Sequence, residues 1–208
     1  MIEVICVPVG YLKTNCYIFH VKGRTDCVVV DPGDEPKKIF KALEDEQVTP
    51  SHILLTHSHF DHIYAIPKLV EKYPDIKVVA YEKEKPLLED MVLNGSKDFH
   101  RSTEITPDII LEEGEYELAG AKFKVIHTPG HTTGSVSFYF YENNFCFTGD
   151  TLFQENIGRS DWPTGNSEEI LNSISQKLFA LPDETDIFPG HGPATTIKNE
   201  KANNPYFR

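Results

Sequence analysis

The segment THSHFDH, residues 56–62, places three histidines and one aspartate within seven positions of a chain that has only 9 histidines in total. Chance clustering is a poor explanation for this density. In an extended or turning segment, side chains at positions i, i+2 and i+4 point to one side, so His57, His59 and Asp61 are expected to converge. With His62 added, four ligand-type side chains are hard to fit around one tetrahedral ion, and the segment therefore predicts a metal site with a second ion.

The apolar pattern around this segment predicts alternating strands and helices. Residues 1–30 are typical of a strand meander, followed by a turn at Asp31, a helix over 35–46 and a short buried strand that ends at the histidine cluster. Helices are also expected at 63–73 and 167–179, strands at 77–81, within 109–149 and at 185–190, and short helix plus loop over 82–107. Within 109–149, EEG (112–114) and ENN (142–144) are expected to be turns between paired strands. This mixture predicts an α/β (α+β) fold of two mixed sheets flanked by helices, in a single domain over 1–208.

Charge and apolar patterning exclude several classes of partner. The formal net charge of −12 argues against nucleic acid and anionic membranes, because phosphate contacts need clustered Lys and Arg. The apolar runs are far too short for a membrane span, and the first residues lack the basic region of a signal peptide, so a cytoplasmic location is expected. The four cysteines form no C-x-x-C pair and are expected to be reduced and buried. We expect a small-molecule substrate, and the sequence leaves the oligomeric state open.

Three more residues of ligand type follow downstream, each directly after a glycine and in a turn that is expected to end a strand: His131, Asp150 and His191. Any one of them alone would be weak evidence. Together with the cluster they give five histidines and two aspartates, which is three ligands for each of two divalent ions and one shared carboxylate, with a water or hydroxide completing the bridge. Imidazole and carboxylate ligands without thiolate suit zinc, iron or manganese, and zinc is the default expectation.

The motifs THSHFDH, PGHTTGS, GDTLF and PGHGPATTI, in this order, resemble those of the metallo-β-lactamase fold superfamily, particularly its short glyoxalase II-like hydrolases. The resemblance covers nearly the whole chain and is more specific for the fold and the metal site than for the substrate. It implies a four-layer αββα sandwich with the site at one edge, where the two sheets meet. Carried over by position, it implies two metal positions that share one bridging ligand: the first on His57, His59 and His131, the second on Asp61, His62 and His191, with Asp150 as the bridge.

The mechanism expected for such a site follows from charge. Two divalent ions should lower the pKa of a bridging water enough to supply hydroxide near neutral pH, and one ion can polarise the substrate carbonyl. Asp150 would hold both ions, and Asp61 could steer the proton of the attacking water. Metal-bound histidines commonly donate their second ring N–H to a carboxylate or carbonyl, and Asp31 and Thr56 are candidates for such contacts. For Asp31, stabilisation of the Asp-Pro-Gly turn is an equally good explanation.

Two residues are candidates for substrate contacts, Arg159 and Phe99, the latter in the loop 93–103. The simplest explanation for Arg159 is a salt bridge with Asp161 that fixes its loop. In glyoxalase II, a basic residue of the equivalent loop helps to hold the glutathione moiety and is followed by an aromatic residue, whose place Asp161 takes here. Glyoxalase II also carries a helical domain with further basic residues, whereas only 17 residues follow His191. The resemblance therefore leaves glutathione specificity open.

The leading hypothesis is a binuclear metal-dependent hydrolase in which metal-bound hydroxide attacks a small thioester or related acyl substrate of the S-hydroxyacylglutathione type. One alternative is a persulfide dioxygenase with a single non-heme iron on His57, His131 and Asp150, and another is a lactonase. A β-lactamase is disfavoured because no cysteine stands near the second metal position, and a nuclease because the chain is acidic. A structural metal module would need a closed coordination sphere, which a bridging water disfavours.

Overall fold

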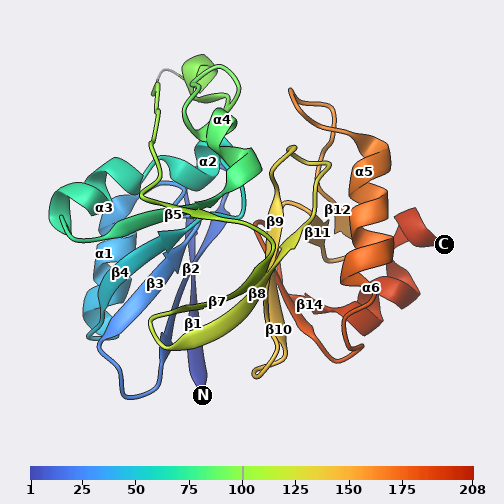
Figure 1. The fold of residues 1–208 in the computed structure, drawn as a ribbon, viewed down its shortest axis with the longest axis horizontal. Helices are drawn as coiled ribbons and strands as arrows, with labels where there is room; N and C mark the ends of the chain where they lie inside the picture. Colours follow the sequence, from blue (N-terminus) through green and yellow to red (C-terminus); the bar gives the residue numbers. More distant parts are fainter. Residues whose placement is uncertain (100) are drawn as a thin grey trace.

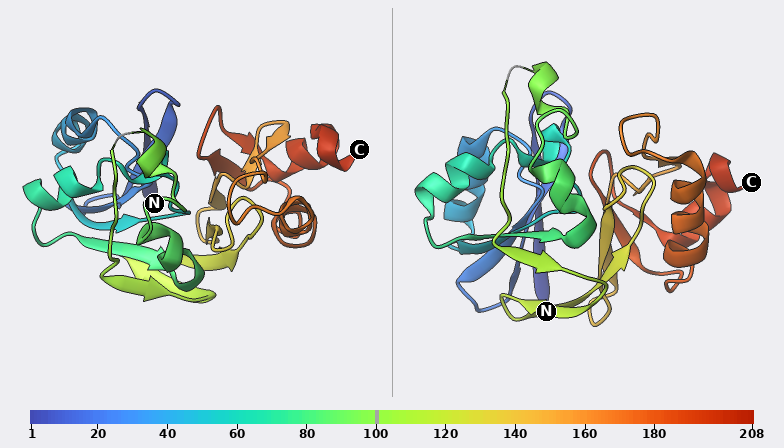
Figure 2. Two further views of the ribbon diagram at one scale, coloured as in Figure 1. Left: turned by 90° about the horizontal axis from the view of Figure 1, so that it is seen from above. Right: turned by 45° about the horizontal axis from the view of Figure 1, so that its top comes forward.

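The computed structural model describes residues 1–99 and 101–208. Two six-stranded sheets face each other in the middle, and helices cover their outer sides (Figures 1 and 2). The strand order is β1-β2-β3-β4-β5-β6 in the first sheet and β14-β13-β10-β9-β8-β7 in the second. Each sheet contains parallel and antiparallel pairs. The expected α/β sandwich of two mixed sheets flanked by helices is confirmed.

The first part of the chain supplies the first sheet and its helices. The strands β1 to β3 form the expected antiparallel meander, and the later strands of this sheet pair in parallel. Short 3₁₀ turns at Glu82–Glu84 and Ser96–Phe99 flank the last helix of this part. The elements are β1 (Ile2–Val9), β2 (Thr14–Val21), β3 (Asp26–Val30), α1 (Pro36–Asp45), β4 (Thr49–Leu54), α2 (Phe60–Ile63), α3 (Ile66–Lys72), β5 (Lys77–Tyr81), α4 (Lys85–Leu88) and β6 (Ile109–Leu111).

The second part of the chain supplies the second sheet and the helices on its outer side. A π-helical turn at Ser173–Leu178 extends α5, and a 3₁₀ turn at Pro205–Phe207 follows α6. Among the described residues, none of the helices is both long and apolar enough to cross a membrane. The elements are β7 (Gly114–Leu118), β8 (Ala121–His127), β9 (Val136–Phe140), β10 (Phe145–Gly149), β11 (Leu152–Phe153), β12 (Asn156–Ile157), α5 (Ser167–Asn172), β13 (Asp186–Pro189), β14 (Thr195–Thr196) and α6 (Ile197–Asn203).

Alternation of side chains along the buried strands explains the layers. Successive strand residues point to opposite faces of a sheet. In β2, Cys16 and Ile18 pack on the side of α1 and α3, whereas Tyr17 and Phe19 point into an aromatic core between the two sheets. A third core, which includes Cys146 of β10, lies beneath α5 and α6. Three apolar interfaces therefore hold the four layers together.

Local structure differs from the sequence predictions at three places. The helix expected over 63–73 is shorter and begins at Ile66 as α3, with Pro67 in its first turn, where the missing N–H is tolerated. A separate short helix, α2, precedes it. The acidic turn at 112–113, expected to join two paired strands, instead carries the chain from β6 in the first sheet to β7 in the second. Cys6 is exposed and not buried, because β1 is an edge strand. None of these differences alters the arrangement of the layers.

Candidate metal centre

The histidine-rich segment leaves the carboxyl end of β4 and turns directly into α2. His57 and His59 lie in the connecting loop, and His59 still has an extended backbone, with φ −61° and ψ 149°. Asp61 and His62 follow Phe60 and lie within α2. The change from extended to helical backbone inside the motif directs the first two side chains and the last two toward different parts of one centre.

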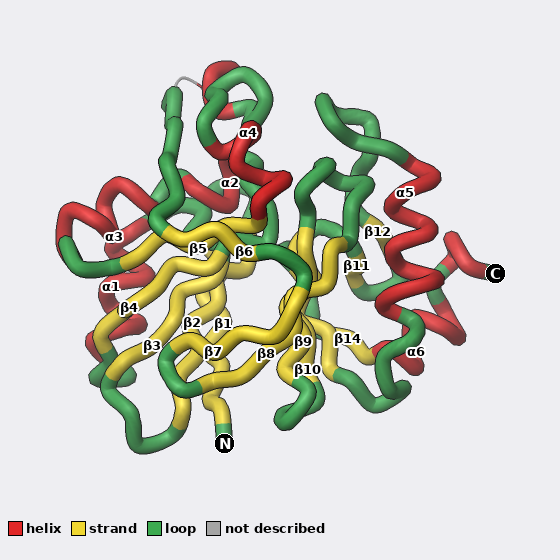
Figure 3. Tube along the Cα trace, in the orientation of Figure 1, coloured by secondary structure: helices red, strands yellow, loops and turns green. Residues whose placement is uncertain are grey.

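Three turns of the second sheet carry one ligand each: His131 between β8 and β9, Asp150 after β10, and His191 after β13. The loops after β4 and β8 lie at the same edge of the two sheets, the upper side of Figure 3. Close approach at this edge requires glycine. A Cβ on Gly149, which has φ +49°, would lie 2.3 Å from Thr56 Oγ1, and one on Gly190 would lie 2.1 Å from Asp150 Oδ1. Any side chain at these positions would push the turns apart.

The seven residues form two triads around a shared carboxylate. In each triad the potential ligand atoms lie within 4.8 Å of one another. The Oδ2 atom of Asp150 is 3.6 Å from His131 Nε2 and 3.4 Å from His191 Nε2, and its Oδ1 atom is 3.4 Å from His62 Nε2. The carboxylate therefore faces ligand atoms of both groups: the first triad is His57, His59 and His131, and the second triad is Asp61, His62 and His191.

Several atoms of this centre lack partners within the protein. Among the described residues, His57 Nε2, His62 Nε2 and Asp150 Oδ1 are buried and form no hydrogen bond. Leaving a buried polar atom unpaired costs about 1–3 kcal/mol, and such atoms need a specific explanation. Divalent ions would satisfy them, since imidazole and carboxylate are ligands of zinc, iron and manganese. The residues present therefore fit divalent metal ions.

Asp31 contacts His62 of the second triad, and Thr56 contacts His57 of the first triad. Asp31 Oδ2 lies 3.0 Å from His62 Nδ1 and accepts a hydrogen bond of 2.5 Å from the Thr56 hydroxyl. The same hydroxyl lies 3.1 Å from His57 Nδ1. Asp31 is buried and has φ 48°, a conformation that is uncommon for an aspartate and is often found at functional sites. Contacts of this kind orient the rings of metal-bound histidines.

Backbone carbonyls hold two further histidines. His131 Nδ1 lies 2.7 Å from the Arg159 carbonyl, and His191 Nδ1 lies 3.2 Å from the Leu12 carbonyl. A carbonyl can only accept, so Nδ1 carries the proton in both rings and Nε2 is left to face the centre. His59 differs, because its Nδ1 atom is the one that faces His131 Nε2, at 2.8 Å.

The two triads differ in the pKa values of their histidines. In the first triad, burial lowers the pKa of His131, lowers that of His59 to about 3, and lowers that of His57 well below its ordinary value. In the second triad, burial again opposes the charged form, but nearby carboxylates outweigh it. They raise the pKa of His191 to about 10 and that of His62 well above its ordinary value. Without metal at neutral pH, the first triad is therefore neutral and the second carries protonated imidazoles.

A buried glutamate that the sequence interpretation missed joins the two loops of the first triad. Glu84 accepts hydrogen bonds from the Ser58 N–H at 2.7 Å and from the Thr132 hydroxyl at 2.8 Å. Ser58 stands between two ligands and Thr132 directly follows the third. Burial raises the pKa of Glu84 to about 7. The sequence around Glu84 does not indicate that this residue is buried, because only the tertiary structure distinguishes it from its exposed neighbour Glu82.

A cleft of about 320 Å³ opens onto the centre. Arg159 and Phe99, the two predicted substrate residues, both line it, together with Trp162 and Leu12. Leu12 was not predicted to do so. Arg159 also forms the expected salt bridge, with bonds of 2.8 and 3.0 Å to Asp161. Its guanidinium lies 4.8 Å from the centre of the Trp162 ring. Substrate contact by Arg159 and Phe99 stays a prediction; within the loop 93–103, residue 100 lies outside the described residues.

Comparison with known proteins connects this centre to one family and to curated relatives. The family described as the Metallo-beta-lactamase superfamily matches residues 9–191, which contain both triads and Asp150. The "Probable metallo-hydrolase YqgX" of Bacillus subtilis is 40% identical over 204 residues, covering 96% of this chain and 95% of the relative. The "Hydroxyacylglutathione hydrolase GloC" of Haemophilus influenzae is 35% identical over 203 residues, covering 96% of this chain and 95% of the relative.

Two solved structures share the fold over nearly their whole length. The BLEG-1 B3 metallo-beta-lactamase has a TM-score of 0.93 and 39% identity, covering 99% of each chain. TTHA1623 in a di-iron-bound form has a TM-score of 0.87 and 37% identity, covering 97% of this chain and 99% of the other. The similarity therefore extends through all four layers and includes both sides of the metal centre.

Proposed function

The chain belongs to the metallo-beta-lactamase superfamily, and from that premise we propose that it hydrolyses a small thioester of the S-hydroxyacylglutathione type at a centre of two divalent ions. Zinc is the metal that we propose, with iron or manganese as alternatives. Bound ions would lower the pKa of a shared water, so that hydroxide is available at neutral pH, and would polarise the thioester carbonyl. The protein then has to hold the ions, direct the water and place the substrate.

The observation that carries the proposal is the position of Asp150 between the triads. Its two oxygens lie within 3.6 Å of imidazole nitrogens from both groups. A single ion would engage one triad and leave the ligands of the other triad without a metal. The shared carboxylate therefore supports a centre of two ions.

In this proposal, Asp61 directs the attacking water. It lines the cleft, accepts a hydrogen bond of 2.8 Å from the Thr14 hydroxyl, and lies 3.2 Å from His191 Nε2. Burial tends to raise the pKa of Asp61, but the rings of His62 and His191 outweigh burial and lower it below its ordinary value. The carboxylate is therefore ionised at neutral pH. It can accept a hydrogen bond from water and orient it, but it is poorly suited to store a proton.

The substrate class is supported by the relative named for hydroxyacylglutathione hydrolysis. This chain covers 95% of GloC, so a protein of similar length carries that name. A thioester of this type has an anionic thiol portion. This portion would compete with Asp161 for the Arg159 guanidinium, which borders the cleft and is largely exposed. The backbone carbonyl of Arg159 contacts His131 of the first triad.

Two other activities have specific support. The dioxygenase alternative needs one iron on His57, His131 and Asp150, and His131 lies near ligand atoms of each of the other two. A similar structure titled a di-iron-bound form supports iron as the metal, although with two ions. Hydrolysis of a β-lactam is supported by the similarity to BLEG-1, which is titled a B3 metallo-beta-lactamase. Attack on a strained cyclic amide needs the same water and the same polarised carbonyl.

A direct comparison of substrates tests the proposal. The protein is stripped of metal, reloaded with zinc, manganese or iron, and assayed with S-lactoylglutathione, a β-lactam and glutathione persulfide, the last with measurement of oxygen uptake. We expect thioester hydrolysis with two ions per chain and a much lower rate on the β-lactam. Oxygen uptake with one iron per chain, in the absence of thioester hydrolysis, would overturn the proposal.

A further inference from the structure

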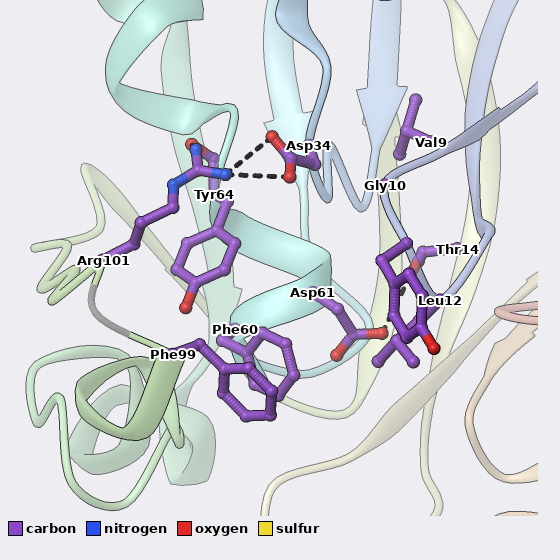
Figure 4. A pocket seen from close by; sticks show the side chains of 11 residues that line it. Val9, Gly10, Leu12, Thr14, Asp34, Phe60, Asp61, Tyr64, Phe99 and Arg101 are labelled. Carbon is purple, nitrogen blue, oxygen red and sulfur yellow. Dashed lines mark hydrogen bonds and ion pairs between the residues drawn. The ribbon is translucent and has the colours of Figure 1, made fainter.

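A second cavity lies directly beside the metal centre. It has a volume of about 220 Å³ and is lined by residues of the turn between β1 and β2 and of α2, and by Phe99 and Arg101 (Figure 4). Its walls are mainly apolar and include Val9, Leu12, Phe60 and Phe99. Figure 4 shows the rings of Phe60 and Phe99 against each other, and their centres are 4.0 Å apart.

The cavity adjoins the cleft over the metal centre. Leu12, Phe60, Asp61 and Phe99 line both spaces. Asp61, a member of the second triad, stands at the boundary, with its carboxylate held by Thr14. A substrate whose reacting carbonyl lies over the metal centre can therefore extend a neighbouring group past Asp61 into the cavity.

The charged groups of the cavity wall already have partners. Arg101 forms two contacts of 2.8 Å with the Asp34 carboxylate, and its guanidinium lies 4.3 Å from the centre of the Tyr64 ring. The Tyr64 hydroxyl donates to the Ser96 carbonyl at 3.3 Å. Because these charges neutralise each other, the cavity is better suited to an apolar group than to an anion or a cation.

The two ends of the cleft differ in polarity. Arg159 lies on the side of the first triad, where its carbonyl contacts His131. The apolar cavity lies on the side of the second triad, beyond Asp61. An anionic thiol portion near Arg159 would therefore leave the acyl portion of the thioester directed toward the cavity.

We infer that the cavity holds an apolar acyl chain of the substrate, an inference that rests on the proposed thioester hydrolysis. The natural substrates would then be aliphatic acyl thioesters and not only short hydroxyacyl thioesters. At ~30 Å³ per water, the cavity has room for roughly seven waters or an acyl chain of about four to six carbons. Each methylene that enters it should raise kcat/KM roughly three- to fourfold.

A series of glutathione thioesters tests the inference on the metal-loaded protein. Acetyl, butyryl, hexanoyl and decanoyl esters are compared in the wild type, Phe99→Ala, Leu12→Asn and the control Val92→Ala. Phe99, Leu12 and Val92 are all substantially exposed, so the variants should fold, and Val92 does not line the cavity. In the wild type and in Val92→Ala, we expect kcat/KM to increase from acetyl to hexanoyl and to remain constant beyond it. In Phe99→Ala and Leu12→Asn, the increase with chain length should be much smaller.

The possible results separate the inference from the function on which it rests. If the acetyl ester is hydrolysed but kcat/KM does not depend on chain length, the inference is wrong and the proposed function stands. A dependence that persists in both Phe99→Ala and Leu12→Asn places the acyl site elsewhere and also overturns the inference. If no thioester is hydrolysed with any metal, both fail together.

Discussion

The two triads of the metal centre use the same kinds of ligand in different surroundings. The first triad consists of three histidines that are at most 3% exposed, and its imidazoles are neutral because burial lowers their pKa values. The second triad contains a carboxylate, and its His191 side chain is 25% exposed at the cleft. Carboxylates raise the pKa values of its histidines, against the effect of burial.

This difference implies different chemistry of metal binding. An ion that enters the first triad meets imidazoles that are already deprotonated near neutral pH. An ion that enters the second triad must displace the protons of His62 and His191, because only neutral imidazole binds metal. The second triad is therefore expected to exchange its ion more readily and to respond more strongly to pH.

The largest effect is expected from Asp150→Ala, because this residue faces both triads. Both ions should bind more weakly, and thioester hydrolysis should fall by at least about a thousandfold. Elemental analysis after dialysis and steady-state assays measure the two effects. A variant that retained two ions per chain and its activity would show that the triads do not depend on a shared carboxylate.

His59→Ala and His191→Ala form a matched pair, since each removes one imidazole from one triad. Each should lose one ion and keep the other, with activity reduced by about a hundredfold or more. The ion retained in His59→Ala should be removed faster by a chelator than the ion retained in His191→Ala. Equal removal rates would show that the electrostatic difference between the triads has no effect on binding.

The metal-free protein should show opposite pH dependences from the two triads. The folded-state pKa of His59 is lowered to about 3, so the first triad costs stability as pH falls below about 6.5. The folded-state pKa of His191 is raised to about 10. Protonated His191 therefore stabilises the folded protein fully below about pH 6.5. This stabilisation, at most a few kcal/mol in the free energy of unfolding, is lost as the pH rises toward 10. Denaturant unfolding between pH 5 and 10 measures this, and His191→Ala should lose only the alkaline part.

The smallest effect is expected from Glu84→Gln, which alters only the hydrogen bonds between the two loops of the first triad. The pKa of Glu84 is raised from about 4.5 in the unfolded chain to about 7 in the folded protein. Its protonated form therefore stabilises the fold fully below about pH 4.5, and this stabilisation is lost as the pH rises through 7. The variant should therefore become more stable than the wild type as pH rises across this range, by on the order of 1–3 kcal/mol. Exposed Glu82→Gln is the control and should show no such trend.

Much of the centre could be predicted because its ligands are marked locally. Four ligands fall within one short segment, and each of the other three follows a glycine at the end of a strand. The carboxyl ends of neighbouring strands lie at one sheet edge, so turns far apart in sequence could be expected to meet. Alternating apolar residues likewise predicted the meander and the two buried sheets, because strand faces repeat every second residue.

What could not be predicted depends on long-range contacts. Glu84 is one of several acidic residues in its segment, and only its contact with the loop of Ser58 distinguishes it from them. The apolar cavity is built by the β1–β2 turn, α2 and the chain near Arg101, which are distant in sequence. No local pattern indicates that Arg101 pairs with Asp34 across 67 positions. Such contacts are known only once the layers are assembled.

The most direct test of the central claim is thioester hydrolysis by metal-free protein as divalent ions are added stepwise. The proposed centre holds two ions around one carboxylate, which faces ligand atoms of both triads. Activity should therefore rise mainly with the second equivalent and reach its plateau at two ions per chain. Full hydrolytic activity at one ion per chain, with no further change on adding a second, would contradict the account.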